Sequence, residues 1–162
     1  LEAIETGHDA WRTLDIVIVP GITAMLAVAA RAGAPLGHDF CALSLSDNLK
    51  PWELIERRLD AAASAGFVIA LYNPVSRARP WQLAKAFALL SRHLPGATPV
   101  IFGRAIGRAD EDMTVITLGA ASDIEADMAT LIIVGSRETR LIAREGKSPL
   151  VYTPRAVEGM MA

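Results

Sequence analysis

Short stretches of apolar residues recur along the chain, separated by segments of mixed polarity. The apolar stretches lie at 15–20, 40–46, 67–72, 98–103, 113–118 and 130–135. Stretches this short are typical of strands, and an unbroken apolar run predicts a strand that is buried on both faces. Residues 52–65 instead place their charged side chains on one helical face. We expect helices at 24–31, 52–65, 81–93 and 122–128, and the end of a helix within 1–11.

The order of these elements predicts an α/β fold. Stretches 98–103 and 113–118 should pair antiparallel, because their connection is too short for a crossover helix. A mixed five-strand sheet with helices is therefore expected in residues 34–162, as a C-terminal α/β domain. The chain begins without an initiator Met, in residues that already have a helical pattern. We interpret residues 1–33 as the remnant of an N-terminal α/β domain, comprising its last strand and a linker helix.

Composition and charge narrow the function classes. The formal net charge is −2, and basic residues form no long cluster in the sequence. The sequence therefore argues against binding to nucleic acid or to a membrane surface. No apolar run reaches the length of a membrane span, and no signal peptide is visible. Cys41 is the single cysteine, and the three histidines lack metal-ligand spacing, so neither an internal disulfide nor a metal site is expected. A cytoplasmic protein with a small ligand is the simplest interpretation.

Polar residues follow several of the predicted strands, where ligands of α/β proteins usually bind. Asn73, Arg77 and Arg79 come after 67–72, although an ordinary solvated loop would have the same composition. Two glycines and two arginines follow 98–103, which favours either an anion site or a bend with exposed arginines.

Two further positions are open to more than one interpretation. Thr23 follows a Pro-Gly turn and is a candidate N-cap for helix 24–31, in either a ligand-binding turn or a plain tight connection. Asp47 is either an N-terminal cap for helix 52–65 or a carboxylate directed into a cleft.

Taken together, these motifs resemble the tetrapyrrole methylases, the class III S-adenosylmethionine (SAM) methyltransferases. The resemblance rests on Pro-Gly-Ile-Thr-Ala at 20–24, Leu-Tyr-Asn-Pro at 71–74 and the strand end at Gly103. Segments 44–53, 79–83 and 103–107 are similar, more narrowly, to the family branch that methylates C-17 of precorrin-3B in cobalamin biosynthesis. The resemblance covers nearly the whole chain. The Gly-rich loop and Gly-Asp-Pro motif of the family's first domain are absent from the sequence.

The resemblance implies methyl transfer from SAM to C-17 with ring contraction, S-adenosyl-L-homocysteine as product, and a homodimer. It implies cofactor contacts at Thr23, Ala24, Tyr72 and Gly103, and we add the neighbours Asn73, Arg104 and Ala105. Our hypothesis for the proton chemistry is Asp47 or Asn73. Because precorrins are polycarboxylates, arginines are candidate clamps for their acetate and propionate arms: Arg77, Arg79, Arg104 and Arg108.

Three alternatives remain open at this point. The anaerobic route has a cobalt-factor III C(17)-methyltransferase with the same signature. Other relatives methylate uroporphyrinogen, other precorrins, a modified histidine or an RNA ribose, although the RNA substrate would predict a basic surface. The chain could also be a binding or dimerisation module without catalysis, since the first half of the cofactor site is missing.

Overall fold

The computed structural model describes residues 1–76 and 78–156. Its centre is a five-stranded mixed sheet of order β2-β3-β6-β4-β5, which confirms the expected α/β class. The strands are β2 (Phe40–Ser44), β3 (Val68–Tyr72), β4 (Pro99–Arg104), β5 (Asp112–Thr117) and β6 (Thr130–Val134). Strands β2 and β3 are parallel, and β6 lies antiparallel between β3 and β4. Strands β4 and β5 pair antiparallel, as their short connection predicts.

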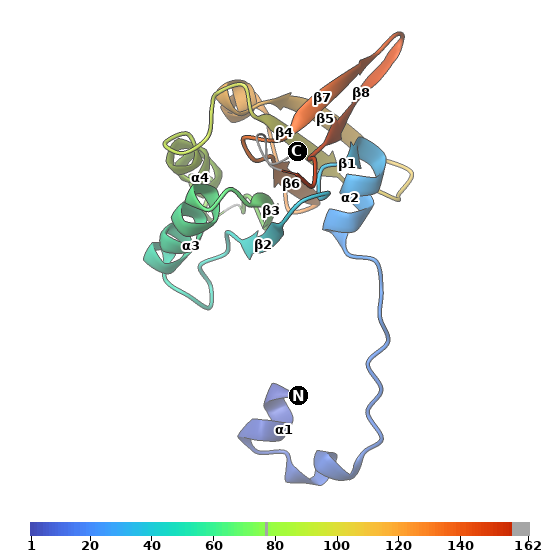
Figure 1. Cartoon of the computed structure of the whole chain (residues 1–162). Helices are drawn as coiled ribbons and strands as arrows, with labels where there is room; N and C mark the ends of the chain where they lie inside the picture. Colours follow the sequence, from blue (N-terminus) through green and yellow to red (C-terminus); the bar gives the residue numbers. More distant parts are fainter. Residues whose placement is uncertain (77, 157–162) are drawn as a thin grey trace.

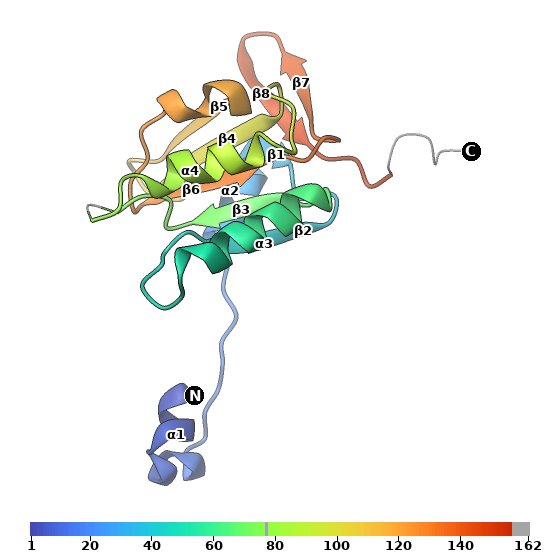
Figure 2. The same cartoon turned by 90° about the vertical axis from the view of Figure 1, so that its left-hand side faces the viewer.

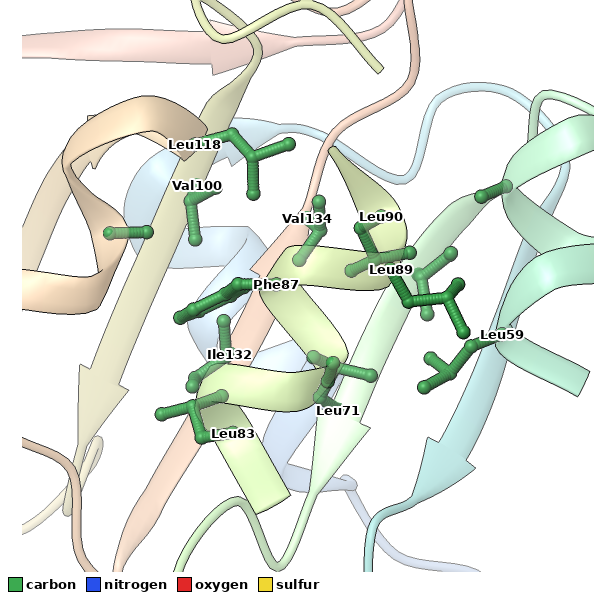
Figure 3. Close-up of a cluster of buried hydrophobic side chains, with 14 of the residues drawn as sticks. Leu59, Leu71, Leu83, Phe87, Leu89, Leu90, Val100, Leu118, Ile132 and Val134 are labelled. Atoms are coloured by element: carbon green, nitrogen blue, oxygen red, sulfur yellow. The ribbon is translucent and has the colours of Figure 1, made fainter. Parts of the chain in front are cut away.

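Helices α3 (Trp52–Ser64) and α4 (Gln82–Leu90) cover one face of this sheet, together with the 3₁₀-helix η2 (Leu118–Asp123) (Figures 1 and 2). Alternate residues of the central strands, such as Leu71 and Ile132, point into this layer beneath α4 (Figure 3). Phe87 of α4 meets Phe102 of β4 edge to face, with ring centroids 6.1 Å apart. The layer is the larger of the two hydrophobic clusters of the molecule and fixes α4 against the sheet.

The opposite face is covered by α2 (Ala24–Ala32) and by Val151 of a second sheet, of order β1-β8-β7. This sheet contains β1 (Gly33–Ala34), β7 (Arg140–Arg144) and β8 (Lys147–Tyr152), and its β7–β8 hairpin projects from the body (Figure 1). This second sheet was not expected from the sequence, because residues 140–149 are exposed or half-buried and carry no continuous apolar run. Val28, Ala32 and Val151 connect α2 and β8 to the underside of the first sheet.

Thr153 joins the two sheets. Its buried hydroxyl donates to the Pro35 carbonyl at 2.6 Å and lies 2.8 Å from the Thr139 hydroxyl. The Thr139 hydroxyl in turn accepts from the backbone N–H of Ser136. These buried polar groups form hydrogen bonds with one another, so we interpret Thr153 as a structural residue.

The predicted strand at 15–20 is not formed, and this prediction is wrong for the structure described here. Residues 1–23 lie away from the body, with α1 (Glu2–Thr6) and the 3₁₀-helix η1 (Asp9–Thr13) followed by an extended segment (Figures 1 and 2). Val17 and Val19 are 75% and 82% exposed. A strand needs a neighbour to accept and donate its ladder hydrogen bonds, and no described strand lies beside this segment.

The predicted helix at 122–128 is also wrong. Residues 118–123 form η2, and residues 127–130 form a tight turn instead of a helix. The Asp127 carboxylate accepts hydrogen bonds from the Ala129 N–H and the Thr130 hydroxyl. An Asp side chain that binds nearby backbone in this way competes with helix formation.

Candidate functional site

The loops that carry most of the predicted site residues lie at one edge of the five-stranded sheet. Strands β2, β3 and β4 run in the same direction and end at this edge, while the antiparallel strand β6 begins there. The register places Arg104, the last residue of β4, opposite Thr130, the first residue of β6. Four connections therefore meet at one edge of the sheet, which is where the polar strand ends were expected to converge.

A first pocket of about 190 Å³ lies at this edge. Six of its lining residues are among the predicted site residues, namely Ala24, Tyr72, Asn73, Gly103, Ala105 and Arg108. The other six were not predicted: Val28, Ile106, Met128, Ala129, Thr130 and Leu131. Residues 128–131 precede or begin β6, and their place in the pocket follows from the antiparallel direction of that strand. The sequence offered no direct signal for that direction.

Backbone strain is concentrated in this pocket. Within the described ranges, the non-glycine residues with positive φ are Asn73, at 51°, and Ala105, at 50°. Asn73 directly follows β3, Ala105 directly follows β4, and both line the first pocket. Such a conformation costs about 1–3 kcal/mol at each residue, and residues held in it cluster at functional sites. The strain supports a ligand-binding role for this edge.

The start of α2 is tied to the same pocket by Tyr72. The backbone N–H of Met25 donates to the Tyr72 hydroxyl at 3.2 Å. Thr23 is the N-cap residue, as expected, but its hydroxyl makes no capping hydrogen bond. Thr23 is exposed and is not among the residues that line the pocket. At the start of α2, the acceptor for a free backbone N–H is therefore the Tyr72 hydroxyl and not the Thr23 hydroxyl.

Gly103 has a clear packing reason to lack a side chain. A Cβ placed on it would collide with Cγ2 of Val28 and approach Cγ1 of Val28 to 2.9 Å. The absence of a side chain lets helix α2 approach β4 closely and brings Ala24 to the pocket.

Arg104 differs from the role predicted for it. Its guanidinium donates to Asp127 at 2.9 Å and to Asp110 at 3.1 Å on the surface. These two carboxylates raise the pKa of Arg104, mainly through the hydrogen bond to Asp127. Arg104 does not line the first pocket. Its hydrogen bond to Asp127 instead stabilises the 127–130 turn at the surface. That turn forms part of the pocket wall.

The turn is also held by charge. The hydrogen bond from Thr130, and to a smaller extent that from Arg104, lowers the pKa of Asp127 below its ordinary value of 3.8. In the connection between β4 and β5, Glu111 accepts from the Gly107 N–H at 2.9 Å and pairs with Arg31 of α2 at 3.0 Å. The Gly107 hydrogen bond is the main reason that the pKa of Glu111 is lowered.

A second pocket, of about 260 Å³, shares Asn73 and Met128 with the first pocket. Its other lining residues are Ser46, Asn48, Ser76, Arg79 and Gln82. Arg79 forms an ion pair with the part-buried Asp47. Asp47 therefore does not cap helix α3, whose N-cap is Pro51. Its carboxylate contacts Arg79, which lines the second pocket, but Asp47 is not itself among the lining residues. The predicted clamp Arg77 lies outside the described residues.

A larger groove of about 530 Å³ runs between α3 and α4 and shares no lining residue with the other two pockets. Its wall carries charges of both signs, including Glu56, Arg57 and Lys85. Neither strained residue contributes to it. Among the described residues, no group of three or more His, Cys, Asp or Glu side chains is placed to hold a metal ion. In the same part of the chain, no helix has both the length and the apolar character needed to cross a bilayer.

These observations define an α/β protein with two adjoining pockets at the carboxyl ends of its strands. The chain belongs to the family of Tetrapyrrole (Corrin/Porphyrin) Methylases, whose model matches residues 4–122. A solved structure, described as that of the methyltransferase CobJ, superimposes with a TM-score of 0.83 at 44% identity, covering 94% of this chain and 62% of that one.

Two curated relatives are similar over most of the chain. A precorrin-3B C(17)-methyltransferase from Sinorhizobium is 65% identical over 98% of this chain. A probable cobalt-factor III C(17)-methyltransferase from Salmonella typhimurium is 44% identical over 88% of this chain. The chain spans 62% of the first relative and 57% of the second.

Proposed function

We propose that this chain is part of a SAM-dependent C-methyltransferase that methylates C-17 of precorrin-3B, with ring contraction, in cobalamin biosynthesis. The observation that carries the proposal is the first pocket, where the start of α2 and the ends of β3 and β4 meet at Ala24, Tyr72 and Gly103. The 65% identity to the Sinorhizobium enzyme supports this substrate.

The composition of the first pocket fits one side of a nucleoside-containing cofactor. Val28, Ile106 and Leu131 offer an apolar surface for a flat base, and the residues with positive φ, Asn73 and Ala105, line the same pocket. Its volume of about 190 Å³ is below the roughly 300 Å³ at which small-molecule pockets usually begin. We therefore assign it as one wall of a larger cleft. When bound, SAM supplies an electrophilic methyl group, and S-adenosyl-L-homocysteine remains.

The protein's task in such a reaction is mainly to hold the reacting groups in line. Tyr72 fixes the start of α2, and Gly103 lets that helix approach. Arg79 and Arg108 line the second and first pockets and are the candidate clamps for carboxylate arms. Proton transfer is assigned to Asp47, with Asn73 as the other candidate.

An Asp47→Asn substitution in the complete enzyme tests the role of Asp47. We expect turnover to ring-contracted product to fall by about 10²–10⁴-fold, the range for loss of a general acid or base. Binding of the cofactor should change less than threefold. Ring contraction at a near-normal rate would remove Asp47 from the mechanism and leave Asn73, tested in the same way by Asn73→Ala.

The domain organisation is part of the proposal. We assign residues 1–33 to the end of an N-terminal α/β domain and a linker helix, and residues 34–162 to the C-terminal domain. The exposed apolar segment 15–20 would then complete the sheet of the preceding domain. The chain's coverage of the Sinorhizobium and Salmonella relatives, 62% and 57% of their lengths, supports this assignment.

Calorimetry with S-adenosyl-L-homocysteine tests the cofactor assignment. We expect micromolar binding by a protein with both domains and much weaker binding by residues 1–162 alone. Micromolar binding by residues 1–162 alone would contradict the need for a second domain. Absence of binding by both proteins would overturn the cofactor assignment and would favour the alternative of a non-catalytic binding or dimerisation module.

A second candidate function is methylation of cobalt-factor III, favoured by the 44% identity to the Salmonella relative. Incubation of the complete enzyme with metal-free and with cobalt-loaded substrate separates the two. We expect the metal-free substrate to be methylated faster. We further propose a homodimer in the cytoplasm, which sedimentation of the complete protein and cell fractionation test.

A further inference from the structure

Gln82, one of the residues that line the second pocket, has a buried side-chain donor without an acceptor among the described residues. Gln82 is 1% exposed, and its side-chain Nε2 has no partner in residues 1–76 or 78–156. Trp52 Nε1 is the other such nitrogen in these ranges, but Trp52 does not line this pocket. A buried amide without an acceptor is unfavourable, and in a pocket it indicates a ligand atom that completes the hydrogen bond.

The donor lies at the start of a helix. Gln82 is the first residue of α4, a helix of nine residues whose N-cap, Trp81, supplies no side-chain cap. The hydrogen bond from the Lys85 N–H to the Trp81 carbonyl opens the helical ladder. The N–H groups of residues 82–84 therefore lie outside it and carry the partial positive charge of a helix N-terminus, which favours an anionic ligand group.

The remaining wall supplies further donors. Ser46, Asn48 and Ser76 line the pocket with hydroxyl and amide groups. Arg79 uses Nη1 for Asp47 and Nε for the Ser76 hydroxyl, at 3.4 Å, and neither contact involves Nη2. Because Asp47 offsets the charge of Arg79, the pocket would recognise an anion mainly through hydrogen-bond donors and the helix terminus. A single small carboxylate fits such a site better than a multiply charged phosphate does.

We propose that the second pocket binds a carboxylate group, with Gln82 Nε2 and the N-terminus of α4 as donors. This inference rests on the proposed function for the source of the carboxylate. Asn73 and Met128 line both pockets, so a ligand in the first pocket has a neighbour in the second. The carboxylate comes either from the amino-acid end of the cofactor or from an acetate or propionate arm of the tetrapyrrole.

The first experiment observes Gln82 directly in residues 1–162. The side-chain amide signals of Gln82 are assigned in the wild-type protein by triple-resonance NMR, which links them to the side-chain carbons of Gln82, and their loss in Gln82→Leu checks the assignment. Addition of sodium propionate should shift these signals saturably, whereas sodium chloride at the same ionic strength should not. Lys85→Ala, which alters the exposed side of the same helix, should leave the titration unchanged. The wild-type titration decides the matter even if the Leu variant does not fold.

The second experiment separates the two sources in the complete enzyme. If the cofactor supplies the carboxylate, Gln82→Leu weakens S-adenosyl-L-homocysteine binding by about 10- to 100-fold but leaves its decarboxylated analogue unaffected. If the tetrapyrrole supplies the carboxylate, Gln82→Leu weakens binding of uroporphyrin III. Binding of S-adenosyl-L-homocysteine and of its decarboxylated analogue should then stay unchanged. The thermal midpoint of Gln82→Leu should be equal to or above that of the wild type, because an unpaired buried donor is removed.

The outcomes distinguish this inference from the proposed function. A propionate-dependent shift of Gln82 without any S-adenosyl-L-homocysteine binding would keep the carboxylate site and remove the cofactor assignment. Normal cofactor binding together with no Gln82 shift and no effect of Gln82→Leu on any probe would overturn the carboxylate site and leave the proposed function intact.

Discussion

Gly103 shows how one missing side chain shapes the site. It lies where α2 crosses β4, and an added Cβ would collide with Val28. We predict that Gly103→Ala lowers the free energy of unfolding by about 1–3 kcal/mol, the usual cost of overpacking a core position. It should also displace the start of α2 and weaken ligand binding in the first pocket. Urea unfolding measures the first effect and calorimetry the second.

The matched control for this prediction is Val28→Ala, which removes the two methyl groups that an added Cβ would meet. If the collision is the cause, Gly103→Ala should cost clearly less stability in the Val28→Ala background than in the wild type. Strictly additive losses would show that Gly103 is required for another reason, such as its backbone conformation.

At the scale of elements, the 127–130 turn is the wall of the first pocket that depends most on a charge. Asp127 binds the Ala129 N–H, the Thr130 hydroxyl and Arg104 in its ionised form, and its pKa is lowered from 3.8. A carboxyl whose folded-state pKa is lowered stabilises the fold above its unfolded-state pKa. This contribution is lost as the pH falls through the lower, folded-state value.

We therefore predict that acid loosens this turn before the rest of the sheet. As the pH falls below the ordinary carboxyl pKa of 3.8 and through the lowered pKa of Asp127, hydrogen exchange in residues 128–131 should rise and the unfolding free energy should fall. Asp127→Asn should remove part of this pH dependence, whereas Asp123→Asn, at an exposed position outside the turn, should not. An unchanged acid response in Asp127→Asn would disprove the role of the carboxylate.

The elements that could be predicted from the sequence are those whose pattern of apolar and polar residues is compatible with only one type of secondary structure. The apolar stretches at 67–72 and 130–135 are buried strands because no other short element removes so many consecutive apolar residues from water. Strand β7 escaped prediction, because it pairs through its backbone while all of its residues stay exposed. The helix predicted at 122–128 failed because Asp127 binds its own turn in preference to the helical ladder.

The same reasoning explains what could be predicted of the site. Gly103 was expected from the family resemblance, and Asn73 and Ala105 were added as neighbours of the expected contacts. All three line the first pocket because β3 and β4 finish at the same edge of the sheet. Met128 and Gln82 were not found, because their positions depend on the direction of β6 and on the docking of α4. Such relations involve residues far apart in the chain, and a local pattern does not contain them.

At the scale of the whole molecule, the extended segment before α2 stands apart from the body. Ile16, Val17, Ile18 and Val19 are all at least 49% exposed, although they form a stretch typical of a buried strand. An apolar segment with unpaired backbone groups readily joins another sheet or another copy of the chain. The proposed N-terminal domain would supply the strand that it lacks.

A double substitution, Val17→Asp with Val19→Asp, tests this view of the segment. In residues 1–162, neither side chain packs against the body, so the unfolding free energy should change by less than about 0.5 kcal/mol and self-association should decrease. In a protein that includes the preceding domain, the same change would bury two charges in a sheet and should cost several kcal/mol. Urea unfolding of both proteins, with sedimentation of the shorter one, measures these effects. Equal and small losses in both proteins would show that the segment stays exposed and that residues 1–33 do not complete a second domain.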